Sequence, residues 1–279
     1  MERDACYGPV MRDLGARFGD LASSSSAKVL VPGAGLGRLV FDLALAGFEA
    51  EGNELSYHQL FTSGYILNHT TSPNQHRLFP FAHTFSNHHN RADQMQAVSI
   101  PDIHPGSCQP LKGSMSMTTG DFIDVYQGEE YEDHFDAVAT VFFVDTAPNF
   151  LAYVETVKRC LKQGGWWINV GPLLWHFGEK EKEKGKSSDE DVADDSSVEE
   201  AMDHEAQQAT DETKTKQTRI GSSGGSIQLT DEEVVKILQI SGFEIEVHET
   251  SALSTGYVQN SRSMLLNSYR PSHWVARKL

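Results

Sequence analysis

The stretch VLVPGAGLGRLVFDLALAGFEAEGNE, residues 29–54, restricts the fold of this chain more than any other segment. It begins with a short apolar strand, and a turn with three glycines follows, in which the backbone can approach a ligand closely. These glycines are Gly33, Gly35 and Gly37. Apolar residues then recur at helical spacing, and a second strand is expected over 48–52, with Glu54 just past its end. This order is typical of a parallel βαβ unit, which binds ligands at the carboxyl ends of its strands.

The spacing of these glycines favours one nucleotide over another. The dinucleotide pattern G-x-G-x-x-G places its third glycine five residues after the first, but here Arg38 stands at that position and Gly37 precedes it. The resulting G-x-G-x-G pattern suits S-adenosylmethionine better than NAD, because the methionine portion lies over the turn and no pyrophosphate needs the helix N-terminus. Glu54 is expected to accept hydrogen bonds from the two ribose hydroxyls. A tight strand–helix turn without a ligand remains the alternative.

Composition narrows the class of protein. A length of 279 residues suffices for one large α/β domain with a well-buried core. The net charge of −16 argues against nucleic acid as a partner, since phosphate binding needs a basic face. The three cysteines lack paired or metal-type spacing, which fits a reducing compartment. Because no segment resembles a membrane span or a signal peptide, we expect a soluble protein of the cytoplasm, or also of the nucleus.

Much of the acidity is concentrated in residues 178–226. This segment holds many charged residues and almost no large apolar ones, so burial cannot offset the entropy of ordering it. We interpret it as a disordered insertion within a single domain that spans 1–279. A solvated spacer is favoured over a functional acidic arm.

Apolar runs predict the other strands. The run FDAVATVFFVDTA is apolar almost throughout, as expected for a central parallel strand buried on both faces, and the strand is expected to end at Asp145. Further strands are expected at 115–117, 164–173, 243–250 and 273–279. Because helices alternate with these strands, the chain is predicted to be an α/β protein with a doubly wound, mostly parallel sheet. The two C-terminal strands are expected to be mixed in direction.

Spacing and capping residues predict three more helices. A helix over 57–68 is expected to bury one apolar face. The residues of that face are Leu60, Phe61 and Ile66. A second helix is expected over 149–161, and Thr230 begins a third, with Glu233 completing a capping box. Residues 70–120, which are rich in His, Asn and Pro, are expected to be irregular.

Several longer segments match one enzyme family in the same order along the chain. They are VLVPGAGLGRL, GNELSYHQL, FPFAHTFSN, SIPDIHP, SMTTGDF, FFVDTAPN, WINVGPLLWHF and LTDEEVVKIL. FFVDTA together with GPLLWHF is specific, because neither belongs to generic members of the fold. With these segments the chain resembles the carnosine N-methyltransferase family, the N2227-like group of S-adenosylmethionine-dependent methyltransferases. The resemblance implies a Rossmann-like class I methyltransferase fold with a seven-stranded sheet.

The same resemblance implies the residues that hold S-adenosyl-L-methionine. Gly33 and Glu54 are expected to contact the cofactor, with Gly35 beside them in the turn. A further pair, Asp121 and Phe122, is expected at the adenine end, where a carboxylate can accept from the amino group and a ring can lie against the base. Val141 stands where the family has a cofactor-contacting cysteine, so its contact is expected through the backbone or by packing.

The implied substrate is carnosine, which would be methylated to anserine, or a related histidine-containing peptide. The substrate contacts implied by the resemblance are Asp145, His176, Tyr257 and Tyr269. Asp145 is expected to hydrogen-bond one imidazole nitrogen and leave the other facing the methyl group, while the alternative is a cap of the following helix. We expect Asp145, His176 and Tyr269 to be the catalytic set, and a homodimer is left open.

Family members carry a helical segment, with a Gln and an Arg on the cofactor's carboxylate, ahead of the position where this chain starts. The cavity is therefore expected to lack part of its lid. The aromatic stretch ahead of Tyr269 is also replaced. Leu266, Asn267 and Ser268 stand there.

Three alternatives stay open. The cluster His83, His88 and His89 resembles no dedicated zinc pattern and is interpreted as loop lining of the substrate cleft, so no metal is expected. A protein that binds S-adenosylmethionine without catalysis is a second alternative for the whole chain. An NAD-dependent oxidoreductase is a third, which Arg38 at the third glycine position weakens.

Overall fold

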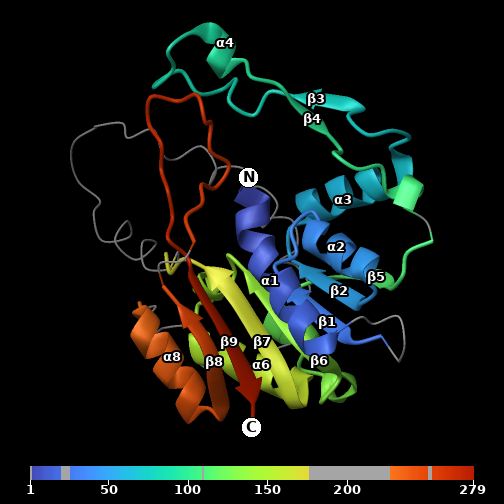
Figure 1. The fold of residues 1–279 in the computed structure, drawn as a ribbon, viewed down its shortest axis with the longest axis vertical. Helices are drawn as coiled ribbons and strands as arrows, with labels where there is room; N and C mark the ends of the chain where they lie inside the picture. Colours follow the sequence, from blue (N-terminus) through green and yellow to red (C-terminus); the bar gives the residue numbers. More distant parts are fainter. Residues whose placement is uncertain (1, 20–25, 109, 176–226, 251–252) are drawn as a thin grey trace, which may run out of the picture.

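The structure is a computed structural model that describes residues 2–19, 26–108, 110–175, 227–250 and 253–279. The expected acidic insertion, 178–226, lies outside these residues. A seven-stranded sheet with the order β5-β2-β1-β6-β7-β9-β8 forms the centre of the described chain (Figure 1). Its strands are β1 (Lys28–Pro32), β2 (Glu49–Glu54), β5 (Ser114–Thr119), β6 (Phe135–Val141), β7 (Leu161–Gly171), β8 (Phe243–Glu249) and β9 (Ser272–Lys278).

Strand direction matches the predicted doubly wound sheet. The neighbours of β1, namely β2 and β6, both run parallel to it, and the outer pairs β2–β5 and β6–β7 are parallel as well. In contrast, β9 runs antiparallel to both β7 and β8, which confirms the expected mixture of directions at the C-terminal end. The carboxyl ends of β1, β2, β5 and β6 therefore meet at one edge of the sheet, where parallel sheets bind their ligands.

Two hydrophobic layers cover the sheet. One contains α1 (Glu2–Phe18) and α2 (Arg38–Ala46), which pack on the face that carries Ala137 and Ala139 of β6. The other contains α5 (Phe122–Val125), α6 (Phe150–Cys160) and α8 (Asp231–Ile240), which pack on the opposite face, around Val138. Adjacent β6 residues thus point to opposite layers, as the pleat of a strand requires. No helix in the described ranges has the length and apolar character needed to cross a membrane.

The capping box predicted at Thr230 is confirmed at the start of α8, where Thr230 and Glu233 cap each other reciprocally. The helix expected over 57–68 is α3 (Tyr57–His69), but its predicted inner face is wrong in one position. Phe61 is 75% exposed, whereas Ser63 is buried. Because α3 lies over β2 at the edge of the fold, only a narrow face of the helix packs against the core. Some of its apolar residues, such as Phe61, therefore remain exposed.

Residues 70–108, here called the arm, are more ordered than the sequence predicts. They contain a two-stranded antiparallel sheet of β3 (His76–Leu78) and β4 (Val98–Ile100) and the short helix α4 (Arg91–Gln94). The arm lies above the carboxyl edge of the main sheet and beside residues 253–271, here called the C-terminal loop (Figure 1). The two segments are joined where the Met264 backbone N–H donates to the Asn87 carbonyl oxygen at 2.8 Å.

The first helix, α1, is not predicted from the sequence, because Gly8, Pro9 and Gly15 interrupt its helical pattern. A buried polar group helps to fasten it to the sheet. The imidazole of His273 in β9, which is 1% exposed, contacts the Asp13 carboxylate of α1 at 2.6 Å through Nε2. Its Nδ1 lies 3.2 Å from a carboxylate oxygen of Glu249 in β8. A charged imidazole can donate to both carboxylates at once.

These contacts shift the pKa values of both partners. Burial acts to lower the pKa of His273, but the hydrogen bonds and charges of Asp13 and Glu249 outweigh it and raise that pKa above 6.5. Burial likewise acts to raise the pKa of Asp13, yet the hydrogen bond with His273 and its positive charge bring that pKa below 3.8. Both groups are therefore charged in the folded protein at mildly acidic pH.

Replacing His273 by Gln should lower the free energy of unfolding by about 3 kcal/mol, because it leaves the charge of Asp13 buried without its partner. Urea unfolding measures this effect. His248→Gln is the matched control, since His248 makes a similar 2.6 Å contact with Asp231 but is 32% exposed, and it should cost less than about 1 kcal/mol. Equal losses in the two variants would contradict the role given to His273.

The stabilisation by His273 should also depend on pH. It is complete below the unfolded pKa of about 6.5 and is lost as the pH rises through the raised folded value. The contribution of Asp13 exists above its unfolded pKa of about 3.9 and is lost as the pH falls through its lowered folded value. The stability difference between the wild type and His273→Gln should therefore be largest between about pH 4 and pH 6.5. A pH series of urea titrations checks this.

Candidate cofactor and substrate site

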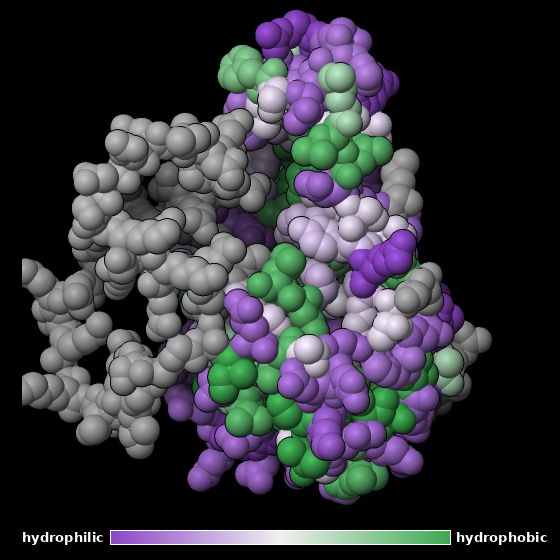
Figure 2. All heavy atoms as spheres, turned by 90° about the vertical axis from the view of Figure 1, so that its left-hand side faces the viewer, coloured by the Kyte–Doolittle hydropathy of each residue, from purple (hydrophilic) through white to green (hydrophobic). Residues whose placement is uncertain are grey.

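A cavity of about 750 Å³ opens at the carboxyl edge of the sheet. Its walls come from the start of α1, the glycine turn, the ends of β2 and β6, the start of α5 and residues 256–258 of the C-terminal loop. On the face drawn in Figure 2, the surface is hollowed between the arm and the body of the molecule. Ligand pockets are commonly about 300–1,000 Å³, so this cavity can hold a nucleoside and a small second ligand together.

The glycine turn has the geometry that its composition predicts. Gly33, Gly35 and Gly37 have φ angles of 63°, 59° and 77°, a left-handed region that residues with a Cβ rarely adopt. At Gly33 there is also no space, because a Cβ atom there would lie 2.5 Å from Cδ2 of Phe143. The turn therefore needs glycine both for its backbone conformation and for the close approach of its neighbours.

Glu54 is the last residue of β2, not just past the strand as the sequence predicts, and it lines the cavity. One carboxylate oxygen accepts from the Gly35 backbone N–H at 2.7 Å and the other from the Ser56 N–H at 2.8 Å. Each carboxylate oxygen has two lone pairs, so acceptor capacity remains for hydroxyl groups of a ligand. Glu54 thus fastens the glycine turn to β2 and presents a buried negative charge to the cavity.

Asp121 and Phe122 follow β5 and line the same cavity. Asp121 caps α5, because one of its oxygens accepts from the Ile123 N–H at 2.9 Å and the Asp124 N–H at 3.3 Å. Phe122 is 3% exposed and meets the rings of Phe143 and Tyr153 edge-on, at 5.6 and 5.3 Å. Neighbouring groups thus hold both side chains, and the adenine contact assigned to the pair stays a prediction.

β6 ends at Val141, which lines the cavity, and not at Asp145 as the sequence predicts. The next residue, Phe142, has a φ of 53° and turns the chain out of the sheet. Its ring stacks on Tyr257 at 5.3 Å and meets Tyr269 edge-on at 5.8 Å. A bulky residue held in the left-handed region is strained and marks a candidate functional position, yet the apolar run gives no signal of it.

Asp145 lies in the short 3₁₀ turn η4 (Val144–Thr146) and is 2% exposed. One of its oxygens accepts from the backbone N–H of Leu174, just after β7, at 2.8 Å. The alternative of a helix cap is wrong, because Asn149 caps α6 through the Leu151 N–H at 3.1 Å. Asp145 instead ties the end of β6 to the segment after β7.

The predicted substrate residues come together only in part. Tyr257 belongs to the cavity wall, whereas Asp145 and Tyr269 are not among the described residues that line it. Tyr269 pairs with Thr255 of the C-terminal loop through two backbone hydrogen bonds. His176 lies outside the described residues, so its predicted role is not tested.

The histidine cluster does not belong to the described cavity wall. His83, His88 and His89 belong to the arm, and none of the three is among the described residues that line the cavity wall. His88 contacts the Thr84 hydroxyl at 3.1 Å. In the described part of the chain, no group of three or more His, Cys, Asp or Glu side chains is arranged to hold a metal ion.

Sequence reasoning does not assign several wall residues to the site. They are Arg3 and Tyr7 of α1, Arg38 of α2, Gln59 of α3 and Phe142. Arg38 alone carried a signal, as the residue that breaks the dinucleotide pattern. The others reach the cavity only because α1, α3 and the C-terminal loop fold over the sheet edge, and no local pattern encodes that.

The sequence model of the carnosine N-methyltransferase family matches residues 1–279. The chain is 39% identical over 277 residues to the carnosine N-methyltransferase of Schizosaccharomyces pombe, covering 99% of this chain and 65% of that protein. It is 36% identical over 278 residues to the carnosine N-methyltransferase of Mus musculus, covering 99% and 58%. The chain thus spans less than two thirds of the length of these two relatives.

Two solved structures share the fold at low sequence identity. A S-adenosylmethionine-dependent methyltransferase from Methanosarcina mazei superposes with a TM-score of 0.52 at 14% identity, covering 97% of each chain. Magnesium protoporphyrin IX methyltransferase from Synechocystis superposes with a TM-score of 0.51 at 13% identity, covering 100% of this chain and 84% of that one. These likenesses confirm the Rossmann-like class I methyltransferase fold predicted from the sequence.

Substituting Gly33 by Ala should lower the free energy of unfolding by about 2 kcal/mol, because alanine is strained at this φ and its Cβ collides with Phe143. Gly64→Ala in α3 is the control. At that position a Cβ meets nothing within 4 Å, and alanine should stabilise the helix by about 0.5–1 kcal/mol. Urea unfolding of both variants checks the opposite signs; a neutral Gly33→Ala would contradict the account of the turn.

Proposed function

The chain belongs to the carnosine N-methyltransferase family, and from that membership we propose that it transfers a methyl group from S-adenosylmethionine to an imidazole ring. The acceptor proposed is carnosine, which becomes anserine, or a related histidine-containing peptide. The observation that carries the proposal is the glycine turn hydrogen-bonded to Glu54 at the wall of a 750 Å³ cavity. That arrangement suits a ribose on the carboxylate and an amino-acid end over the turn.

The residues of the cavity fit S-adenosylmethionine, which when bound supplies a methyl group made electrophilic by a positively charged sulfur. Gly33 and Gly35 line the cavity without a side chain, so a ligand can approach the backbone of the turn directly. Glu54 can accept from the ribose hydroxyls through its remaining lone pairs. Asp121 and Phe122 stand at the end of β5, where an adenine amino group and ring would find an acceptor and an apolar surface.

The acceptor half of the proposal rests on Asp145 and the aromatic residues beside it. A neutral imidazole is already nucleophilic near its pKa of about 6.5, so no strong base is required. Holding its nitrogen in line with the methyl group can contribute about 7–11 kcal/mol. Asp145 would fix the ring by accepting a hydrogen bond from the second nitrogen, and its charge would stabilise the imidazolium that forms. The rings of Phe142 and Tyr257 can add cation–π attraction.

A local movement is needed for Asp145 to act in this way, because Asp145 does not line the cavity. Its neighbours in the same stretch, Phe143 and Thr146, both line the cavity. A small shift of η4 would therefore carry the carboxylate to the cavity surface. Catalytic contacts are often long in structures without ligand and tighten when the substrate binds.

Asp145→Asn should lower kcat for carnosine methylation by about 100-fold or more. The reason is that a neutral amide then replaces the carboxylate whose charge stabilises the imidazolium product. A radiolabelled methyl-transfer assay measures it, and calorimetry should show unchanged binding of S-adenosylhomocysteine. Asp133→Asn is the control, because its side chain is 58% exposed and pairs with Lys278 far from the cavity. No transfer to carnosine or any histidine dipeptide by the folded wild type would refute the proposed function.

Glu54→Gln should weaken the binding of S-adenosylhomocysteine about tenfold, because an amide offers one acceptor oxygen in place of two charged ones. Titration calorimetry gives the dissociation constant. Glu49→Gln, at the opposite end of β2, is the control for the loss of a negative charge on this strand. It should bind S-adenosylhomocysteine as tightly as the wild type. Equal affinities of the Glu54 variant and the wild type would remove the ribose contact from the proposal.

A further inference from the structure

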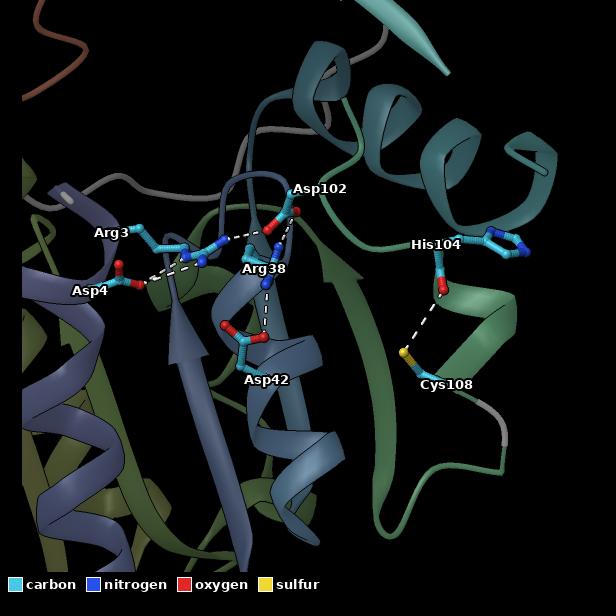
Figure 3. Close-up of polar contacts among 7 residues, drawn as sticks. All are labelled: Arg3, Asp4, Arg38, Asp42, Asp102, His104 and Cys108. Atoms are coloured by element: carbon cyan, nitrogen blue, oxygen red, sulfur yellow. Dashed lines mark hydrogen bonds and ion pairs between the residues drawn. The ribbon is translucent and has the colours of Figure 1, made fainter. Parts of the chain in front are cut away.

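A single carboxylate of the arm joins two arginines at the cavity (Figure 3). Asp102 follows β4, and one of its oxygens accepts from Nη1 of Arg3 at 2.7 Å. The other oxygen accepts from Nη1 of Arg38. Arg38 is held from its second side by Asp42 of the same helix, whose oxygen lies 2.9 Å from Nε. We call the group of Arg3, Arg38 and Asp102 the clasp.

The clasp connects three segments that are far apart in the sequence. Arg3 lies in the first turn of α1, Arg38 is the first residue of α2, directly after the glycine turn, and Asp102 lies at the base of the arm. Asp102 is separated from the two arginines by 99 and 64 residues. Both arginines line the same cavity as Gly35 and Leu36. Because Arg38 directly follows the glycine turn, the clasp ties this part of the cavity wall to α1 and to the arm.

Charge explains why the carboxylate matters here. Two guanidinium groups that converge on one point repel each other unless an anion lies between them. Burial acts to raise the pKa of Asp102, but the hydrogen bonds from Arg3 and Arg38 outweigh it and hold that pKa below 3.8. Asp102 thus remains ionised at neutral pH. Its side chain is 51% exposed, so salt should screen the attraction.

The first turn of α1 also reaches the C-terminal loop. A carboxylate oxygen of Glu2 accepts from the Gln259 backbone N–H at 3.0 Å. The loop in turn binds the arm through Met264 and Asn87. The arm, the loop and α1 are therefore joined in a closed ring of contacts, in which Asp102 contacts α1 from the arm, and α1 and the loop line the cavity.

We propose that Asp102 is a positioning residue that holds Arg3 and Arg38 against the glycine turn and thereby sets the affinity for the amino-acid end of S-adenosyl ligands. The inference rests on the proposed function, which places that end over the turn. Asp102 itself makes no contact with the ligand in this scheme. It acts by keeping α1 and the start of α2 together.

The test compares two ligands that differ only at the relevant end. S-adenosylhomocysteine carries the amino-acid end, and 5′-methylthioadenosine lacks it. Asp102→Asn should weaken S-adenosylhomocysteine binding about tenfold, the loss of about 1.4 kcal/mol, while the affinity for methylthioadenosine changes less than about twofold. Asp102→Glu should recover part of the loss. Calorimetry at low salt gives all the dissociation constants.

Asp4→Asn is the control, because Asp4 also contacts Arg3, at 3.4 Å, from the next position of the same helix. It should leave both affinities unchanged. The difference in S-adenosylhomocysteine affinity between the wild type and Asp102→Asn should also become smaller at about 1 M salt, because the Debye length is then about 3 Å and the charges are screened. In the transfer assay, KM for the methyl donor should rise in Asp102→Asn while kcat changes little.

The outcomes separate this inference from the proposed function. If the folded wild type binds neither ligand, the proposed function fails. If the wild type binds and Asp102→Asn matches it, or if both ligands weaken equally, the positioning role fails while the function stands. If Asp102→Asn does not fold, Arg3→Gln replaces it, because that variant keeps the contact of Asp102 with Arg38. It should show a smaller loss, again confined to S-adenosylhomocysteine; an equal loss for both ligands would overturn the inference.

Discussion

The hydrogen bond between the Gly35 backbone N–H and the Glu54 carboxylate holds the site together, and much of the surrounding structure serves to maintain it. It joins the turn after β1 to the end of β2 at 2.7 Å, on a side chain that is only 8% exposed. A buried carboxylate is costly unless its oxygens are satisfied, and backbone donors from both sides meet that need. The turn therefore keeps one shape before any ligand arrives, so that binding does not have to order it.

The remaining walls are contributed by segments that the sheet does not position by itself. α1 is fastened to β9 by the buried contact between Asp13 and His273, and its first turn then meets the arm and the C-terminal loop. A cavity assembled from such distant parts depends on long-range charges as much as on apolar packing. The stability of α1 and the shape of the cavity are consequently linked.

The sequence predicts the parts of this structure that local chemistry encodes. The glycine turn, the alternation of strands with helices and the capping box at Thr230 each depend on residue types at short spacing, and all three are confirmed. The end of β6 is wrong because Phe142 leaves the strand within an unbroken apolar run, where hydrophobicity gives no boundary. The role of α1 is missed because its buried face includes Asp13, whose partner His273 lies 260 residues away. Long-range partners of this kind have no local signature.

Phe142 and Phe143 are adjacent in the chain, yet they serve opposite halves of the cavity. Phe143 packs against the glycine turn, while Phe142 faces Tyr257 and Tyr269. The two halves thus share one strained piece of backbone. If a ligand in one half moves this dipeptide, its free energy of binding is coupled to that of a ligand in the other half, and linkage makes the coupling equal in both directions. The order of binding and the cooperativity between methyl donor and acceptor would then depend on Phe142 and Phe143.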